Sequence, residues 1–338
     1  MRILLLAGVF ACLGSFNFLN ALDEDPETLA KASLISEVKT AKPGATVWLA
    51  LQFEVAPHWH LGWAVAGDAG LPTAVKWTVP DGVKVGELHF PVPTRFEHEG
   101  FVSFVHEGTF LVLAPLEISS DWETGKAVDV AAEASWSVCN ETNCIPVDQK
   151  LSLSLGTGEQ IAYDDSQKLI FDKGRQSLPT TPPNAVSTSA FLGEKEIVLR
   201  LTGPTLAEVG KVFFFSLDGV VEPAGSQEFS VEDESYVLRM ARAEFSDAPE
   251  RFRGILDLSS SLPEGAKAWM IDLAANGRTF GSGGENALPA NSGDDLNQTK
   301  VESNNPRDDP NAALSPLVWE KWSPERVLAL QQEGRPVY

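Results

Sequence analysis

Hydrophobic and polar residues alternate along many short segments of this chain, and this period of two restricts the fold more than any other feature. One face of the clearest segment consists of Val47, Leu49, Leu51, Phe53 and Val55. Side chains of a β-strand point alternately to opposite faces, so the pattern predicts a strand with one buried face. Further segments of this kind lie at residues 75–79, 101–106, 110–118, 127–138 and 150–155, separated by Pro and Gly. Many short strands at this spacing predict an all-β protein that begins with a β-sandwich over residues 22–156.

A second alternating block predicts another, cysteine-free sandwich over residues 191–280. Its expected strands lie at residues 197–201, 212–215, 236–240, 254–258 and 269–273. Between the two blocks, residues 157–190 predict a short helix followed by an extended Pro-rich linker. Asp164 or Asp165 can cap this helix, which we expect to run to about Gln176.

The last part of the chain has a different composition. Residues 281–315 are rich in Gly, Asn, Asp, Pro and Ser and offer almost no apolar residue for burial, so we expect a flexible acidic linker. Residues 316–338 regain apolar content. Here Ser323 and Pro324 predict the start of a short C-terminal helix, with Ser as cap and Pro at the first helical position.

The first 21 residues predict a secretory signal peptide. A basic start at Arg2 precedes an apolar run over residues 3–13, and cleavage is expected near Ala21. The alternatives are a buried N-terminal helix and a lipoprotein in which Cys12 is lipidated. No later segment has the 18 or more consecutive apolar residues of a membrane-spanning helix, so we expect a periplasmic or secreted mature chain without a membrane span.

Acidic residues outnumber basic ones strongly. Removal of residues 1–21 takes away Arg2 only and leaves 25 Lys and Arg against 47 Asp and Glu, a formal net charge of −22. Such a surface repels nucleic acid and anionic membranes, which excludes nucleic-acid binding as a function class.

Two cysteines, Cys139 and Cys144, remain after removal of the signal peptide, and they have only each other as partners within the chain. One interpretation is a structural disulfide. Closure of so short a loop is worth only about 2 kcal/mol, which favours the other interpretation, thiol–disulfide exchange. No basic residue lies at positions 140–143 to stabilise a thiolate, and Glu141 would oppose one.

A series of spaced landmarks resembles the N-terminal periplasmic domain of the DsbD/ScsB family of thiol:disulfide interchange proteins. It covers about residues 30–156 and consists of Trp59, Gly67-Asp68-Ala69-Gly70-Leu71-Pro72, Trp77, Pro80-Asp81-Gly82, Pro91-Val92-Pro93, Gly100, Trp136-Ser137-Val138-Cys139 and Cys144-Ile145-Pro146. The resemblance implies an immunoglobulin-like sandwich that takes electrons from a thioredoxin-like domain and passes them to periplasmic acceptor proteins. Members of the family take part in cytochrome c biogenesis and disulfide reduction.

The resemblance also implies roles for individual residues. Cys144 would be the nucleophile that forms mixed disulfides with partners, and Cys139 would resolve them. The family covers its disulfide with a cap loop that bears an aromatic residue; here this loop falls within residues 95–101, with Phe96 or Phe101 as candidates. The family's dithiol chemistry needs no cofactor.

The end of the chain departs from the family pattern. Full-length members continue into a multi-helix membrane domain, whereas residues 319–338 of this chain look like the opening of the family's C-terminal thioredoxin-like domain. That domain's Cys-x-x-Cys motif would come after Tyr338. We therefore expect a fragment or truncated product whose electron donor is another protein and whose membrane association, if any, runs through a separate transmembrane partner.

Two other functions stay open at this level. The histidines His58, His60, His89, His98 and His106 all lie in the first sandwich, and His58 and His60 would share one face of a strand, which permits a Cu or Zn site. Alternatively, nine tryptophans could serve a binding module with a structural disulfide. We find no Gly-rich phosphate loop, nucleophilic serine motif or convincing pair of carboxylates. Any enzymatic activity would therefore be that of a protein-disulfide reductase.

Overall fold

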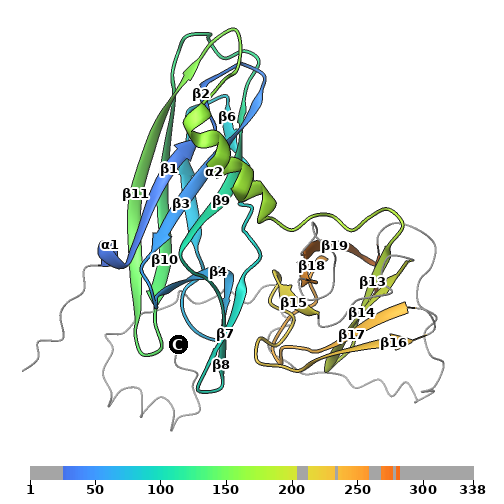
Figure 1. Ribbon diagram of the computed structural model, residues 1–338. Coiled ribbons are helices and arrows are strands. Elements are labelled where there is room, and N and C mark those ends of the chain that lie inside the picture. Colours follow the sequence, from blue (N-terminus) through green and yellow to red (C-terminus); the bar gives the residue numbers. More distant parts are fainter. Residues whose placement is uncertain (1–25, 204–211, 233–234, 259–267, 277–278, 282–338) are drawn as a thin grey trace, which may run out of the picture. The chain divides into compact units, whose positions relative to one another are not determined.

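The computed structural model describes residues 26–203, 212–232, 235–258, 268–276 and 279–281 (Figure 1). The expected signal peptide with Cys12, the acidic linker beyond residue 281 and the expected helix within residues 316–338 lie outside these residues. Among the helices of the described part, none is long and apolar enough to cross a membrane.

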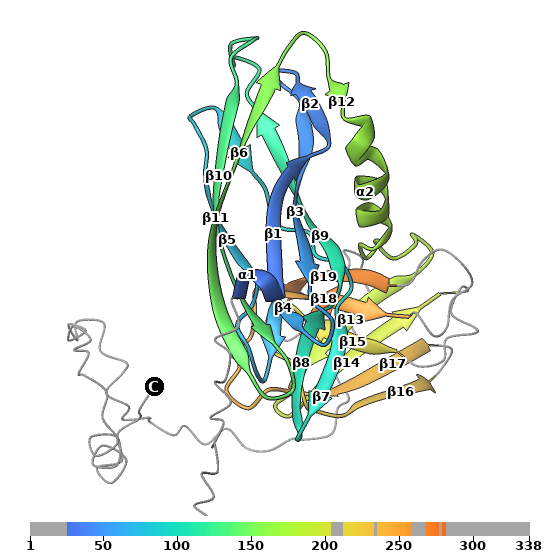
Figure 2. The same ribbon diagram turned by 60° about the vertical axis from the view of Figure 1, so that its left-hand side comes forward.

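The first domain is a sandwich of two sheets, and the short helix α1 (Pro26–Leu29) precedes it (Figures 1 and 2). One sheet has the order β1-β3-β9-β6 and contains β1 (Ala30–Ser36), β3 (Thr46–Val55), β6 (Val83–Val85) and β9 (Thr109–Ile118). The other has the order β12-β2-β11-β10-β4-β8-β7, with β5 also paired to β10. It contains β2 (Val38–Ala41), β4 (His60–Gly67), β5 (Ala74–Thr78), β7 (Thr94–His98), β8 (Phe101–His106), β10 (Val128–Cys139), β11 (Cys144–Thr157) and β12 (Ala162–Tyr163).

The core between the sheets comes from the alternation seen in the sequence. On β3, the apolar row that includes Leu49, Leu51 and Phe53 is buried. Trp136 of β10 faces it from the other sheet, and the rings of Phe53 and Trp136 meet edge to face at 5.2 Å. The strand predicted over residues 47–55 is thus confirmed.

A helix covers the outer face of the first sheet. It is α2 (Asp165–Gln176), and the Asp164 side chain caps it by accepting a hydrogen bond from the Ser166 N–H. Phe171 packs with Ala50 and Leu111, so Ala50 is buried although it lies on the polar row of β3. The predicted helix is confirmed. It is, however, a docked layer of the first domain and not part of a free linker.

The second domain is also built of strands. Its hydrogen-bonded order is β15-β18-β19-β20-β13-β14-β17-β16, and β20 pairs with both β13 and β19. The strands are β13 (Ser187–Leu192), β14 (Glu196–Thr202), β15 (Phe213–Ser216), β16 (Gln227–Glu232), β17 (Ser235–Ala241), β18 (Arg251–Asp257), β19 (Ala268–Asn276) and β20 (Thr279–Gly281). Phe214, Phe252 and Leu199 lie in its core. The all-β fold class is therefore confirmed for both domains.

Candidate functional site

The two cysteines form a disulfide at the last rung of the hairpin of β10 and β11. The antiparallel ladder runs from Val128 opposite Leu155 to Cys139 opposite Cys144, and the sulfur atoms are 2.09 Å apart. In the connecting loop, the Asn140 carboxamide oxygen accepts hydrogen bonds from the N–H groups of Thr142 (2.9 Å) and Asn143 (2.8 Å). Asn140 therefore shapes the turn that returns Cys144 to the ladder.

The two sulfur-bearing residues differ sharply in exposure. Cys139 is 3% exposed, whereas Cys144 is an exposed residue. In thiol–disulfide exchange the attacked or attacking sulfur has to meet a sulfur of another protein. Of the two, Cys144 is the one that solvent and a partner can reach.

A short loop at residues 68–71 lies against Cys139. The Ser137 Oγ accepts a hydrogen bond from the Leu71 N–H (2.7 Å) and lies 3.4 Å from the Cys139 Sγ. Gly70 has φ of +88°, and a side chain there would lie 3.0 Å from the Ser137 Oγ and 3.6 Å from the Cys139 Sγ. A glycine is thus required for both the backbone conformation and the close approach.

The strands β7 and β8 form a hairpin, residues 94–106, that we call the cap hairpin. Glu99 and Gly100 at its turn have φ of +50° and +85°, as in the tight turns that match the twist of two strands. The segment expected to be a loop is therefore a hairpin. It is anchored by Asp68, whose carboxylate accepts a hydrogen bond from the buried Val102 N–H (2.8 Å).

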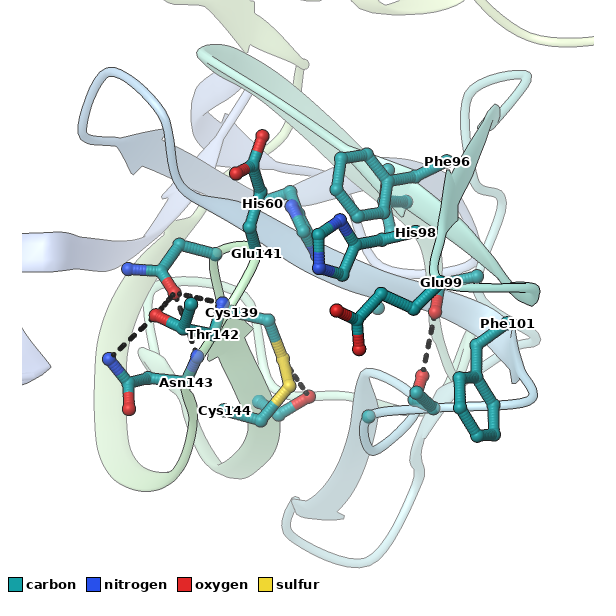
Figure 3. Close-up of a pocket in the computed structure, with 17 residues that line it drawn as sticks. His60, Phe96, His98, Glu99, Phe101, Cys139, Glu141, Thr142, Asn143 and Cys144 are labelled. Carbon is teal, nitrogen blue, oxygen red and sulfur yellow. Dashed lines mark hydrogen bonds between the residues drawn. A yellow bond between two sulfur atoms is a disulfide. The ribbon is translucent and has the colours of Figure 1, made fainter.

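One face of the cap hairpin lines a pocket that contains the disulfide (Figure 3). The ring of Phe96 packs against that of His60 in a tilted arrangement, with ring centroids 4.6 Å apart. Phe101, the other aromatic candidate for the cap, lines the same pocket and is 60% exposed. Both residues thus lie near Cys139 and Cys144, Phe96 inside the pocket and Phe101 at its edge.

The opposite face of the cap hairpin contacts the second domain. Phe104 of β8 meets Phe215 of β15 edge to face at 5.1 Å, and Trp63 of β4 joins them in one buried cluster. The Arg95 guanidinium lies 5.8 Å from the centre of the Phe213 ring. Movement of the cap hairpin as a whole would therefore break contacts between the two domains.

His60 is the histidine closest to the cysteines in the strand register. It is the direct partner of Cys139 across β4 and β10, and it is buried. Burial lowers the pKa of His60 below its ordinary value, which favours the uncharged imidazole. His98 and the carboxylates of Glu99 and Glu141 line the same pocket.

The expected pairing of His58 with His60 on one strand face is wrong. His58 lies in a turn with φ of +69° and is exposed, whereas His60 begins β4. His89 meets Trp48 edge to face, and His106 lies between Phe90 and Phe110. Within the described residues, no group of three or more His, Cys, Asp or Glu side chains is arranged to hold a metal ion.

Residues 28–155 match a family whose description is "Thiol:disulfide interchange protein DsbD, N-terminal". The first domain belongs to the DsbD N-terminal family. The match confirms the resemblance found in the sequence, and it includes both cysteines and the cap hairpin. A search of curated protein sequences gave no match.

A solved structure of an ScsB domain has a similar fold. The N-terminal periplasmic domain of ScsB from Proteus mirabilis superimposes with a TM-score of 0.52 and 13% identity, covering 75% of this chain and 97% of that one. The DsbD N-terminal domain of Neisseria meningitidis in the reduced form gives a TM-score of 0.23 and 15% identity, covering 41% of this chain and 94% of that one. The ScsB likeness extends beyond the DsbD N-terminal family match and so includes residues of the second domain.

Two neighbours of the disulfide could not be found from local sequence signals. His60 is 79 positions from Cys139, and their proximity depends on the pairing of β4 with β10. The hydrogen bond of Ser137 to residue 71 likewise joins segments 66 positions apart. The turn of the cap hairpin, in contrast, has a local signal in the sequence: the Glu99-Gly100 pair between two alternating segments is typical of a β-hairpin turn.

Proposed function

We propose that the DsbD N-terminal domain of this protein relays electrons through Cys139 and Cys144, from a thioredoxin-like donor to exported proteins that contain disulfides. One observation carries the proposal. The disulfide joins an exposed residue, Cys144, to a buried one, Cys139, and both line the pocket beside the cap hairpin. A purely structural bridge needs no such difference in exposure.

The electrons move in pairs. A donor thiolate attacks the Cys144 sulfur, the Cys139–Cys144 bond breaks, and its electron pair stays on the Cys139 sulfur, which takes up a proton. The donor's second thiolate then displaces Cys144 and completes a disulfide in the donor. The domain now holds two thiols, and the same two displacements in reverse order reduce the disulfide of an acceptor.

The cap hairpin supports selectivity in this scheme. Phe96 and Phe101 line the pocket that contains the disulfide, and the loop at residues 68–71 is hydrogen-bonded to the same hairpin, so a partner that enters the pocket contacts these aromatic side chains. We assign them the role of shielding the site from small oxidants and reductants. The predicted signal peptide supports the periplasm as the compartment, where disulfide exchange of this kind takes place.

Trapping tests the proposal. A thioredoxin variant that keeps only its attacking cysteine is activated as a mixed disulfide with 2-nitro-5-thiobenzoate and added to the variants Cys139→Ser and Cys144→Ser. Cys139→Ser should form a covalent complex on a non-reducing gel, and Cys144→Ser, which keeps only the buried sulfur, should form little. Reduced thioredoxin should also open the wild-type bridge. If the bridge resists thioredoxin and neither variant forms a complex, the relay is refuted.

A further inference from the structure

His60 and Cys139 occupy opposite positions on neighbouring strands. Their register as direct partners places both side chains on the same face of the sheet, with Cβ atoms about 4.5–5.5 Å apart. The next pair, Leu61 and Val138, points to the other face and into the core. Both residues also line the same pocket, and an imidazole and a thiol placed in this way can come within reach of proton transfer, directly or through one water molecule.

The pocket holds the His60 ring in place and keeps it uncharged. His60 is 6% exposed, and Phe96 packs on it from the cap hairpin. The other titratable groups of the pocket are His98 on β7, Glu99 in the cap turn and Glu141 in the loop after Cys139, while β8 contributes Phe101, Ser103 and Val105. Since burial lowers the pKa of His60, its ring can accept a proton at neutral pH.

The exchange reaction needs a proton acceptor at this position. Cys139 is 3% exposed, and a thiol in such surroundings loses its proton to solvent less readily than an exposed thiol. Cys144, in contrast, is exposed and can lose its proton to water or buffer. A base is therefore required chiefly in the step in which Cys139 attacks.

We propose that His60 accepts the proton of the Cys139 thiol in the step that re-forms the Cys139–Cys144 disulfide. This inference rests on the proposed function. In the mixed disulfide, Cys144 is bonded to a partner sulfur. The Cys139 proton passes to His60, the Cys139 sulfur forms a bond to the Cys144 sulfur, and the partner leaves as a thiolate with the former bonding pair. The His60 imidazolium then returns the proton to that thiolate, so the dithiol is oxidised, the partner is reduced and His60 is unchanged.

A chromogenic disulfide separates the two steps. The reduced full chain is mixed in a stopped-flow instrument with one equivalent of 5,5′-dithiobis(2-nitrobenzoate), whose thiolate absorbs visible light. The first thiolate is released when Cys144 forms the mixed disulfide, and the second when Cys139 resolves it. Cys139→Ser, which should release only one equivalent, identifies the steps. The test variant is His60→Gln, and His98→Gln in the same pocket is its matched control.

We expect His60→Gln to slow the second release by about 10-fold or more, in the range of general-base effects, and to leave the first release unchanged. In the wild type the rate of the second release should rise with pH as His60 loses its proton, and this rise should disappear in His60→Gln but persist in His98→Gln. A merely structural role of His60 would change both releases or neither, and would not remove the pH dependence.

Other outcomes decide between the two proposals. If the wild type releases both equivalents and His60→Gln does so at the same rate and with the same pH profile, the role of His60 is refuted and the relay stands. If the wild type releases the second thiolate no faster than Cys139→Ser, the relay itself fails. Should His60→Gln not fold, an NMR titration of His60 in the reduced wild type replaces it. The inference is then overturned if the second release does not accelerate over the pH range in which His60 deprotonates.

Discussion

Replacement of Asp68 by Ala should make the disulfide react faster with small reductants. The Asp68 carboxylate accepts a hydrogen bond from the Val102 N–H at 2.8 Å, and the Asp68 N–H donates to the Val102 carbonyl at the same distance. Val102 is 1% exposed, so Asp68→Ala leaves its N–H buried without this acceptor. A hydrogen bond to a charged group contributes about 1.5–3 kcal/mol.

This loss acts on the cap hairpin more than on the rest of the domain. Asp68 directly follows β4 and begins the loop at residues 68–71, which lies against Cys139. Val102 belongs to β8 of the cap hairpin. If opening of the cap precedes attack on the disulfide, a loss of 1.5–3 kcal/mol increases the open population by about 10- to 150-fold, at tenfold for each 1.4 kcal/mol. Reduction by excess dithiothreitol should accelerate by a factor in this range.

The assay counts free thiols over time. The oxidised chain is mixed with dithiothreitol, quenched in acid at intervals and alkylated, and the fraction of reduced protein is measured by mass spectrometry. Asp68→Asn is the matched control, because its carboxamide oxygen can still accept from Val102 while the charge is removed. We expect this variant to react within about threefold of the wild type, a difference of less than 1 kcal/mol.

Urea denaturation of the same variants makes the result decisive. If Asp68→Ala is destabilised as predicted but is reduced at the wild-type rate, the cap hairpin does not control access to the disulfide. If Asp68→Asn accelerates as much as Asp68→Ala, the negative charge controls the reaction and the hydrogen bond does not.

Three further predictions concern stability. Burial lowers the pKa of His106 to about 3 from an ordinary value of 6.5, so its contribution to stability is complete above pH 6.5 and is lost as the pH falls towards 3, by about 5 kcal/mol in all. The urea midpoint should therefore fall more steeply with acidification in the wild type than in His106→Phe, and parallel curves would contradict this. Ser137→Ala removes the acceptor of the hydrogen bond at residue 71 and should cost about 1 kcal/mol in urea denaturation, whereas Ser135→Ala, two positions earlier on the same face of β10, should cost less than half of that. Gly254→Ala would place a methyl group against the ring of Phe214 and should lower the melting temperature of the second domain in calorimetry, by an amount equivalent to about 1–3 kcal/mol. An unchanged melting temperature would show that β15 and β18 accommodate the methyl group without strain.

Local patterns of the sequence were sufficient to predict the strands and the helix. The apolar row on β3 is buried as its alternation requires, and Asp164 caps α2 at the expected end. The Cys139–Cys144 bond was also predicted from the sequence, because Cys12, the third cysteine, lies in the expected signal peptide. These features depend on residues that lie within one turn or one strand of each other.

Features that depend on long-range packing were missed. Ala50 is buried because α2 docks over β3, which no property of β3 itself reveals. His60 is opposite Cys139 because β4 pairs with β10, and His58 leaves the strand because the chain turns there with positive φ. The arrangement of the site is thus set by strand pairing, whereas its residue types were visible in the sequence.

The position of the disulfide at the end of the β10–β11 ladder has a consequence for what its reduction would change in the domain. Eleven residue pairs, from Val128 and Leu155 to Val138 and Ile145, precede the cysteine pair in register, and backbone pairing holds them whether or not the sulfur atoms are joined. Loss of the bond therefore leaves both this ladder and the hydrogen bonds of Asn140 within the connecting loop in place. Under the proposed relay, we therefore expect the domain to alternate between oxidised and reduced forms without refolding, with reorganisation confined to one end of the β10–β11 hairpin.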